Sequence, residues 1–166
     1  MTDFDNLDSS SGIFLTPDGY ERLRKEMEHL TAVKRPEIAD RIRESQGHGE
    51  FSEDNSELDE VKFEQALVEN RIHELKEIFS SASTLDLEHI PTDRAGLGTL
   101  ITVTDLQFHD QFEIRLVCSV ESDPSIDYLS NESPLGIALY GRRPGDEVIF
   151  EAPEGRKKFR IDSIGR

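Results

Sequence analysis

Two stretches of apolar residues, spaced alternately three and four apart, constrain the fold of this chain more than any other feature. The first follows Thr16-Pro17-Asp18, in which Thr16 can cap a helix start and Pro17 suits the first helical position. This spacing is typical of the seam of a two-stranded coiled coil. Because a short polar link joins the stretches, we expect an antiparallel helical hairpin with arms of roughly 30 residues, about 45 Å long. The predicted seam residues are Tyr20, Leu23, Met27, Leu30, Ile38 and Ile42, then Leu58, Val61, Gln65, Val68, Ile72, Leu75 and Phe79.

The first arm contains an irregularity. Lys34 stands where the next apolar seam residue belongs, and Pro36 follows two residues later. Proline lacks the backbone N–H of a regular helix, so we predict a kink or a stutter here. Gly47 and Gly49 are expected to end this helix.

The second half of the chain changes from a helical period to a period of two. Residues 100–104, 111–120, 147–152 and 158–164 alternate or run apolar as strands do, and a capped short helix is expected over 133–141. The fold class is therefore α+β. We assign an acidic tail to 1–12, the coiled coil to 13–83, a linker to 84–95 and a small strand-rich domain to 96–166.

Composition excludes several classes of protein. The 166 residues carry a formal net charge of −16, which argues against a protein that grips nucleic acid by neutralising phosphates. No apolar run is long enough to span a bilayer, so we expect a cytoplasmic protein that does not bind membranes. Cys118 is the only cysteine, and we expect it to be a small buried apolar side chain.

The link between the two arms is rich in carboxylates. Residues 50–60 contain Glu50, Glu53 and Asp54 and continue into further acids, and between Arg43 and Lys62 only His48 could carry a positive charge. Carboxylates gathered without compensating cations suit a hard divalent cation. The alternative is an ordinary solvated acidic turn, since exposed turns are usually polar.

Several motifs, in order and at the right separations, make the chain resemble the bacterial Gre transcript-cleavage factors of the GreA/GreB type. The resemblance covers nearly the whole length after the tail. It rests on 15–20 (LTPDGY), 35–38 (RPEI), 49–53 (GEFSE) with 55–57 (NSE), 133–136 (SPLG), 138–139 (AL) and 145–146 (GD).

The resemblance implies an N-terminal coiled coil and a C-terminal FKBP-like antiparallel β domain with a short helix. It implies that the latter docks on RNA polymerase while the coiled coil enters the secondary channel. At the polymerase active site the tip would help to hold Mg²⁺, so that the polymerase hydrolyses the 3′ end of backtracked RNA. We expect a monomer with no enzymatic activity of its own.

For this chain the resemblance implies that Glu50 and Glu53 are the metal-binding and catalytic carboxylates. Two departures from the family pattern concern them. Glu50 replaces the usual Asp, and Asp54 stands between Glu53 and Asn55, where Glu and Asn are normally adjacent. Asp54 could replace Glu53 in this role, and the spacing does not decide between them.

Basic side chains near the coiled coil contact the extruded RNA in this family. The resemblance therefore implies Arg43, Lys62 and Arg41 as RNA contacts, with Lys34 and Arg35 as further candidates. The alternative for each is an ordinary ion pair on a helix surface.

Two rival functions follow from the same residues. The altered tip could belong to a Gre-like regulator that occupies the channel and inhibits or modulates the polymerase without cleavage. The FKBP-like domain could indicate a peptidyl-prolyl isomerase or chaperone, but fold similarity does not transfer activity, and its aromatic residues are scattered.

Overall fold

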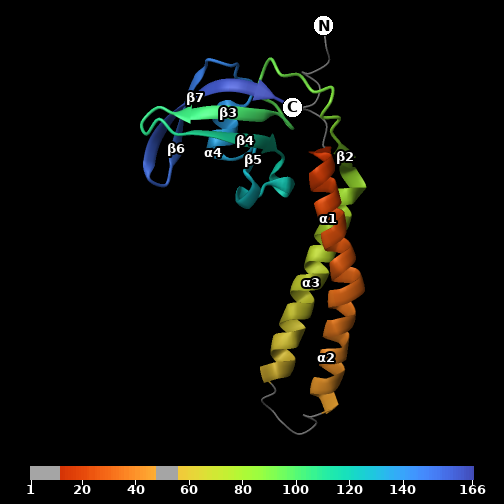
Figure 1. The fold of residues 1–166 in the computed structure, drawn as a ribbon. Coiled ribbons are helices and arrows are strands. Elements are labelled where there is room, and N and C mark those ends of the chain that lie inside the picture. The colour runs from red at the N-terminus through yellow and green to blue at the C-terminus, as the bar shows by residue number, and fades with distance from the viewer. Residues whose placement is uncertain (1–11, 48–55) are drawn as a thin grey trace. The chain divides into compact units, whose positions relative to one another are not determined.

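The computed structural model describes residues 12–47 and 56–166 (Figure 1). The chain divides into two compact units. One unit comprises Tyr20–Ala82, and the other joins the described residues before Tyr20 to Ser83–Arg166.

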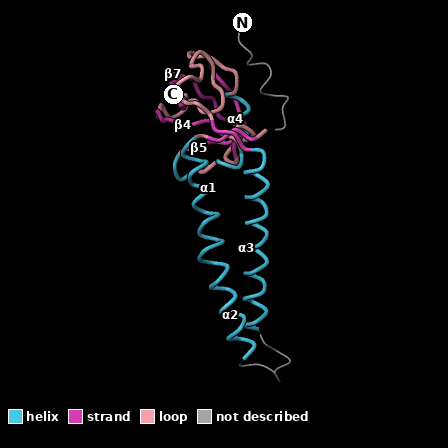
Figure 2. Tube along the Cα trace, turned by 90° about the vertical axis from the view of Figure 1, so that its right-hand side faces the viewer, coloured by secondary structure: helices cyan, strands magenta, loops and turns pink. Residues whose placement is uncertain are grey.

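The unit Tyr20–Ala82 is a helical hairpin, as predicted. Its first arm consists of α1 (Pro17–His29), which begins in the other unit, a π-helical segment η2 (Leu30–Lys34) and α2 (Arg35–Gly47). The second arm is α3 (Ser56–Ser81), whose 26 residues span about 39 Å at 1.5 Å per residue. The two arms lie side by side in both views (Figures 1 and 2).

The predicted seam holds the arms together at most positions. Within the described arms the buried seam residues are Leu23, Ile38, Val61, Val68, Ile72 and Leu75, together with Ile78. Gln65 is the exception, because the structure leaves it exposed. Burying a polar amide in the apolar seam would not lower the free energy of the hairpin. The neighbouring Glu64 instead forms an ion pair with the other arm.

The predicted irregularity in the first arm is the π-helical segment η2. Its last turn closes with a hydrogen bond from the Arg35 N–H to the Leu30 carbonyl, one residue wider than in an α-helix. The Thr31 hydroxyl donates to the Met27 and Glu28 carbonyls, 2.9 and 3.2 Å away. The helix therefore widens over Leu30–Lys34, just before Pro36, without breaking.

The π-helical turn also restores the seam. If the α-helix continued unchanged after Leu30, the seam positions would fall on charged residues at 34, 37, 41 and 44. The one extra residue that the π-helical turn accommodates moves the seam to Ile38, Ile42 and Ser45, of which Ile38 and Ser45 are 2% and 5% exposed. Burying unpaired charges costs far more than a local change of helix type, so the sequence favours the π-helical turn.

The second unit is built on a five-stranded sheet in the order β5-β4-β3-β7-β6. Its strands are β3 (Leu100–Asp105), β4 (Gln111–Val117), β5 (Tyr128–Ser130), β6 (Glu147–Ala152) and β7 (Gly155–Gly165). All neighbouring pairs are antiparallel except β4 and β5, which are parallel. The expected antiparallel sheet is thus a mixed one.

The core of this sheet lies against the short helix α4 (Pro134–Leu139). Leu139 is fully buried among strand residues that include Ile101, Leu116 and Ile161. Ser133 caps the helix by accepting a hydrogen bond from the Gly136 N–H at 3.0 Å. A Cβ at Gly136 would lie 2.0 Å from the Ser130 carbonyl oxygen, so this position requires glycine.

Cys118 lies just beyond β4, where the chain turns into the 3-10 segment η3 (Ser119–Glu121). The predicted strand 111–120 therefore ends earlier, at Val117. Cys118 is half-buried, which is less than expected, and partial burial raises the pKa of its thiol.

The first turn of α1 is bound to this unit through a buried carboxylate. Thr16 caps α1 as predicted, accepting from the Gly19 N–H at 3.0 Å. Its own N–H donates to Glu121 Oε2 at 2.9 Å, and its hydroxyl donates to Glu121 Oε1. Beside it, β1 (Ile13–Leu15) pairs with β2 (Ala82–Thr84).

Candidate functional site

The predicted tip carboxylates Glu50, Glu53 and Asp54 lie outside the described residues. They belong to the eight-residue connection between the ends of α2 at Gly47 and α3 at Ser56. The last described turns of α2 and α3 flank this connection.

Carboxylates dominate these turns. Glu44 on α2 and Glu57, Asp59 and Glu60 on α3 are all exposed. Carboxylates in the first turn of α3 are stabilised by the positive end of the helix dipole. None of the four lies within ion-pair distance of a cation in the part of the chain that the structure describes. Among these described residues no group of three or more potential ligands could hold a metal ion.

The predicted RNA-contacting arginines form ion pairs within the hairpin. Arg41 Nη1 lies 2.6 Å from Glu64 Oε2 of the other arm, and Arg43 pairs with Asp40 on its own helix. The carboxylate of Glu64 raises the pKa of Arg41 by hydrogen bonding. Each of these two guanidinium groups therefore already has a carboxylate partner.

Arg35 is held more tightly than either of them. Its Nε and Nη2 atoms each donate to one carboxylate oxygen of Glu69, both at 2.8 Å. This two-point pair joins the arms and lowers the pKa of Glu69. Planar two-point geometry gives such pairs directional specificity, so Arg35 and Glu69 form a directional link between the arms.

The lysines on the arms behave differently. Lys62 is exposed and lies on α3 six residues after its start, and Lys34 is partly buried at the end of η2. Within residues 12–47 and 56–166 neither ammonium group forms an ion pair. Of the three predicted RNA contacts, Lys62 is thus the one whose charge remains uncompensated by these residues.

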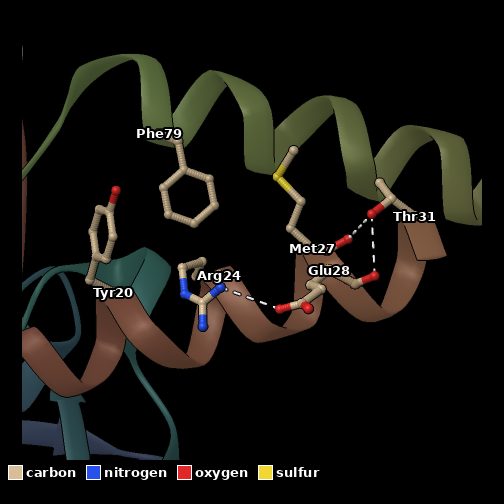
Figure 3. A pocket seen from close by; sticks show the side chains of 6 residues that line it. All are labelled: Tyr20, Arg24, Met27, Glu28, Thr31 and Phe79. Atoms are coloured by element: carbon tan, nitrogen blue, oxygen red, sulfur yellow. Dashed lines mark hydrogen bonds and ion pairs between the residues drawn. The ribbon is translucent and has the colours of Figure 1, made fainter. Parts of the chain in front are cut away.

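A pocket of about 350 Å³ lies at the opposite end of the hairpin from the tip. Tyr20 and Phe79 meet edge to face there, with ring centres 5.2 Å apart, and Figure 3 shows Arg24 paired with Glu28 beside them. Thr31 and Met27 complete its lining. The pocket contains part of the predicted seam and none of the predicted site residues.

Sequence patterns did not identify the partners of these arginines. Nothing in the sequence pattern distinguishes Glu64 and Glu69 from other acids on α3, because the facing register of two helices depends on the length and path of the connection between them. Helical periodicity identifies which residues share a face of one helix. It gives no information about which residue of the other helix lies opposite.

Comparisons with known proteins identify the class to which this hairpin and sheet belong. The family model for the N-terminal domain of GreA/GreB transcription elongation factors matches residues 13–83, and that for the C-terminal domain matches 90–166. The chain therefore belongs to the GreA/GreB family of transcription elongation factors.

Particular relatives are similar along almost their whole length. The transcription elongation factor GreA of Acetivibrio thermocellus is 43% identical over 152 residues, which are 92% of this chain and 95% of that protein. GreA of Clostridium beijerinckii is 39% identical over 160 residues, with 96% and 99% covered. Among solved structures, GreA factor homolog 1 (Gfh1) of Thermus thermophilus is 29% identical, covers 93% of this chain and 99% of its own, and gives a TM-score of 0.43. No described helix is long and apolar enough to cross a membrane.

Proposed function

We propose that this protein enters the secondary channel of RNA polymerase and stimulates hydrolysis of the 3′ end of backtracked RNA. It acts as a monomeric cytoplasmic accessory factor, and the polymerase supplies the catalytic centre. Family membership supports a role in transcription elongation. The observation that carries the proposal is the hairpin itself, whose two arms end at either side of the acidic connection.

A hairpin of this kind suits delivery of a few side chains into a narrow channel. The arm α3 spans about 39 Å and is joined to the first arm by an apolar seam and by ion pairs. Two helices fixed in this way resist bending better than a loop of the same length. The ends of α2 and α3 that flank the acidic connection are therefore held together at one end of the hairpin.

Glu50 and Glu53, with Asp54 as the alternative to Glu53, would hold Mg²⁺ jointly with the polymerase. Their carboxylate oxygens are the hard ligands that Mg²⁺ prefers, and Mg²⁺ commonly takes only one or two carboxylates from a protein. The exposed carboxylates of Glu44 and Glu57 add negative potential on both flanks of the connection. The ion would supply charge stabilisation for the attacking and leaving oxygens of the phosphodiester.

The direct test uses stalled elongation complexes that have backtracked. Adding this protein with Mg²⁺ should shorten the RNA from its 3′ end and allow synthesis to resume, whereas the protein mixed with RNA alone should leave it intact. Cleavage is followed as release of labelled RNA fragments. A saturating concentration of the protein that leaves the cleavage rate unchanged, or slows nucleotide addition at every Mg²⁺ concentration, would contradict the proposal.

A second test concerns contact with the RNA. Replacing Lys62 with alanine should lower the cleavage rate at saturating protein about fivefold, since one charge-assisted contact of roughly 1 kcal/mol is lost. The melting temperature should not change, because Lys62 forms no ion pair with a described residue.

Lys76→Ala is the matched control on the same helix. Arg41→Ala should instead lower the melting temperature by leaving Glu64 unpaired. Equal cleavage by the Lys62 and Lys76 variants would remove Lys62 from the site.

A further inference from the structure

The face of α3 that points away from the first arm carries two exposed apolar side chains. Phe63 is 66% exposed and Leu67 is 54% exposed. They are four residues apart, so they lie about 40° from one another around the helix and one turn apart along it. The seam residues Val61 and Val68 are only 1% and 9% exposed. Phe63 and Leu67 therefore form one outward apolar patch, here called the outer patch.

The hairpin does not need the outer patch for its own stability. The seam already buries Ile38, Val61, Val68 and Ile72 in one apolar cluster, and the outer patch lies on the opposite side of α3. Single exposed apolar residues are common on protein surfaces, but two large ones placed one helical turn apart lie close enough to form a shared apolar area. Such an area gains free energy when another surface covers it.

The charges near the outer patch are mostly negative. Asp59 and Glu60 lie one turn closer to the tip, and neither forms an ion pair with a described residue. Glu64 is neutralised by Arg41, which leaves Lys62 as the one nearby cation without an ion-pair partner among the described residues. A complementary surface would therefore present an apolar recess bordered by Lys or Arg on the side nearest the tip.

We propose that Phe63 and Leu67 form a docking face for a positively charged protein surface with an apolar recess. The proposal rests on the proposed function, in which this surface belongs to RNA polymerase and the hairpin is the part that enters it. Nucleic acid is disfavoured as the occupant because the carboxylates of Asp59 and Glu60 repel phosphates. A second copy of this chain is disfavoured for the same electrostatic reason, since it would bring like charges together.

Binding to polymerase, measured without any cleavage step, tests the proposal. The double variant Phe63→Gln, Leu67→Gln keeps good helix formers on α3 and should raise the Kd for core RNA polymerase at least tenfold. Its melting temperature and its cleavage rate at saturating concentration should equal those of the wild type. Val33→Gln is the control, because Val33 is also exposed, at 48%, but lies on the first arm. Its Kd should not change.

A second pair of substitutions tests the charge pattern. Asp59→Asn with Glu60→Gln should weaken binding at low salt and flatten its dependence on salt concentration. An unchanged Kd for the Phe63 and Leu67 variant would overturn the proposal. Crosslinking of Phe63 to RNA, with Kd unchanged and the saturated cleavage rate reduced, would assign the patch to RNA, and a wild-type dimer that this variant dissociates would assign it to a second copy.

The proposed function and the role of the outer patch are tested by different outcomes. A wild-type protein that binds polymerase but does not accelerate cleavage would contradict the proposed function, and the Kd comparison would still decide the role of the outer patch.

Discussion

The double variant Glu50→Gln, Glu53→Gln is expected to lose stimulated cleavage by a factor on the order of a hundred or more. Glutamine keeps the size and shape of the side chain but removes the charge, and a neutral amide is a weaker ligand for Mg²⁺ than a carboxylate. A metal ion that is held less firmly would be misplaced relative to the reacting atoms, and misplacement by about 1 Å can lower a reaction rate on the order of a hundredfold. Affinity for polymerase and the melting temperature should stay at the wild-type values, because the substitutions do not touch the seam. Release of labelled RNA from backtracked complexes measures the effect.

The matched control removes the same charge elsewhere. Glu88→Gln with Glu132→Gln changes two exposed carboxylates of the sheet-containing unit and should leave cleavage unchanged. Asp54→Asn separates the two candidates for the second ligand. If Glu53→Gln alone is fully active and Asp54→Asn is not, Asp54 is the ligand, whereas full activity of the Glu50 and Glu53 double variant would exclude both residues.

Periodicity in the sequence was enough to predict the helical hairpin. The apolar spacing identified the seam at Leu23, Val61, Val68, Ile72 and Leu75, because a residue's position around a helix depends only on its place in the chain. It failed at Gln65, which the structure leaves exposed. An amide at a seam position fits the pattern by spacing alone and contributes no apolar surface to bury.

Contacts between residues far apart in the chain could not be predicted. The buried Glu121 binds Thr16 across 105 positions, and β5 pairs in parallel with β4 although it is only three residues long. Both depend on how the chain folds back on itself. Neither local propensity nor periodicity carries that information. For the same reason the pairing of Arg41 with Glu64 could not be predicted.

The irregular stretch from Leu30 to Pro36 could be predicted only in part from the sequence. Lys34 and Pro36 correctly indicated a departure from the regular helix, but a kink, a stutter and a π-helical turn all fit the same residues. The decisive information lies further along, in the positions of Ile38 and Ile42. They resume the seam one residue later than an uninterrupted α-helix would place them, and a π-helical turn adds one residue.

Deleting Val33 should therefore leave the hairpin folded, with a melting temperature equal to or above the wild-type value. Removing one residue cancels the extra residue of the π-helical turn, so a regular α-helix would bring Ile38 and Ile42 to the same face.

Deleting Lys25, which is exposed like Val33, is the matched control. No compensating irregularity lies near it, so Tyr20 and Leu23 would rotate by about 100° away from α3. The loss of burial at Leu23 and of the Tyr20 contact with Phe79 should lower the melting temperature by roughly 10 °C. Far-ultraviolet circular dichroism follows both transitions, and equal losses in the two deletion variants would show that the π-helical turn does not set the phase of the seam.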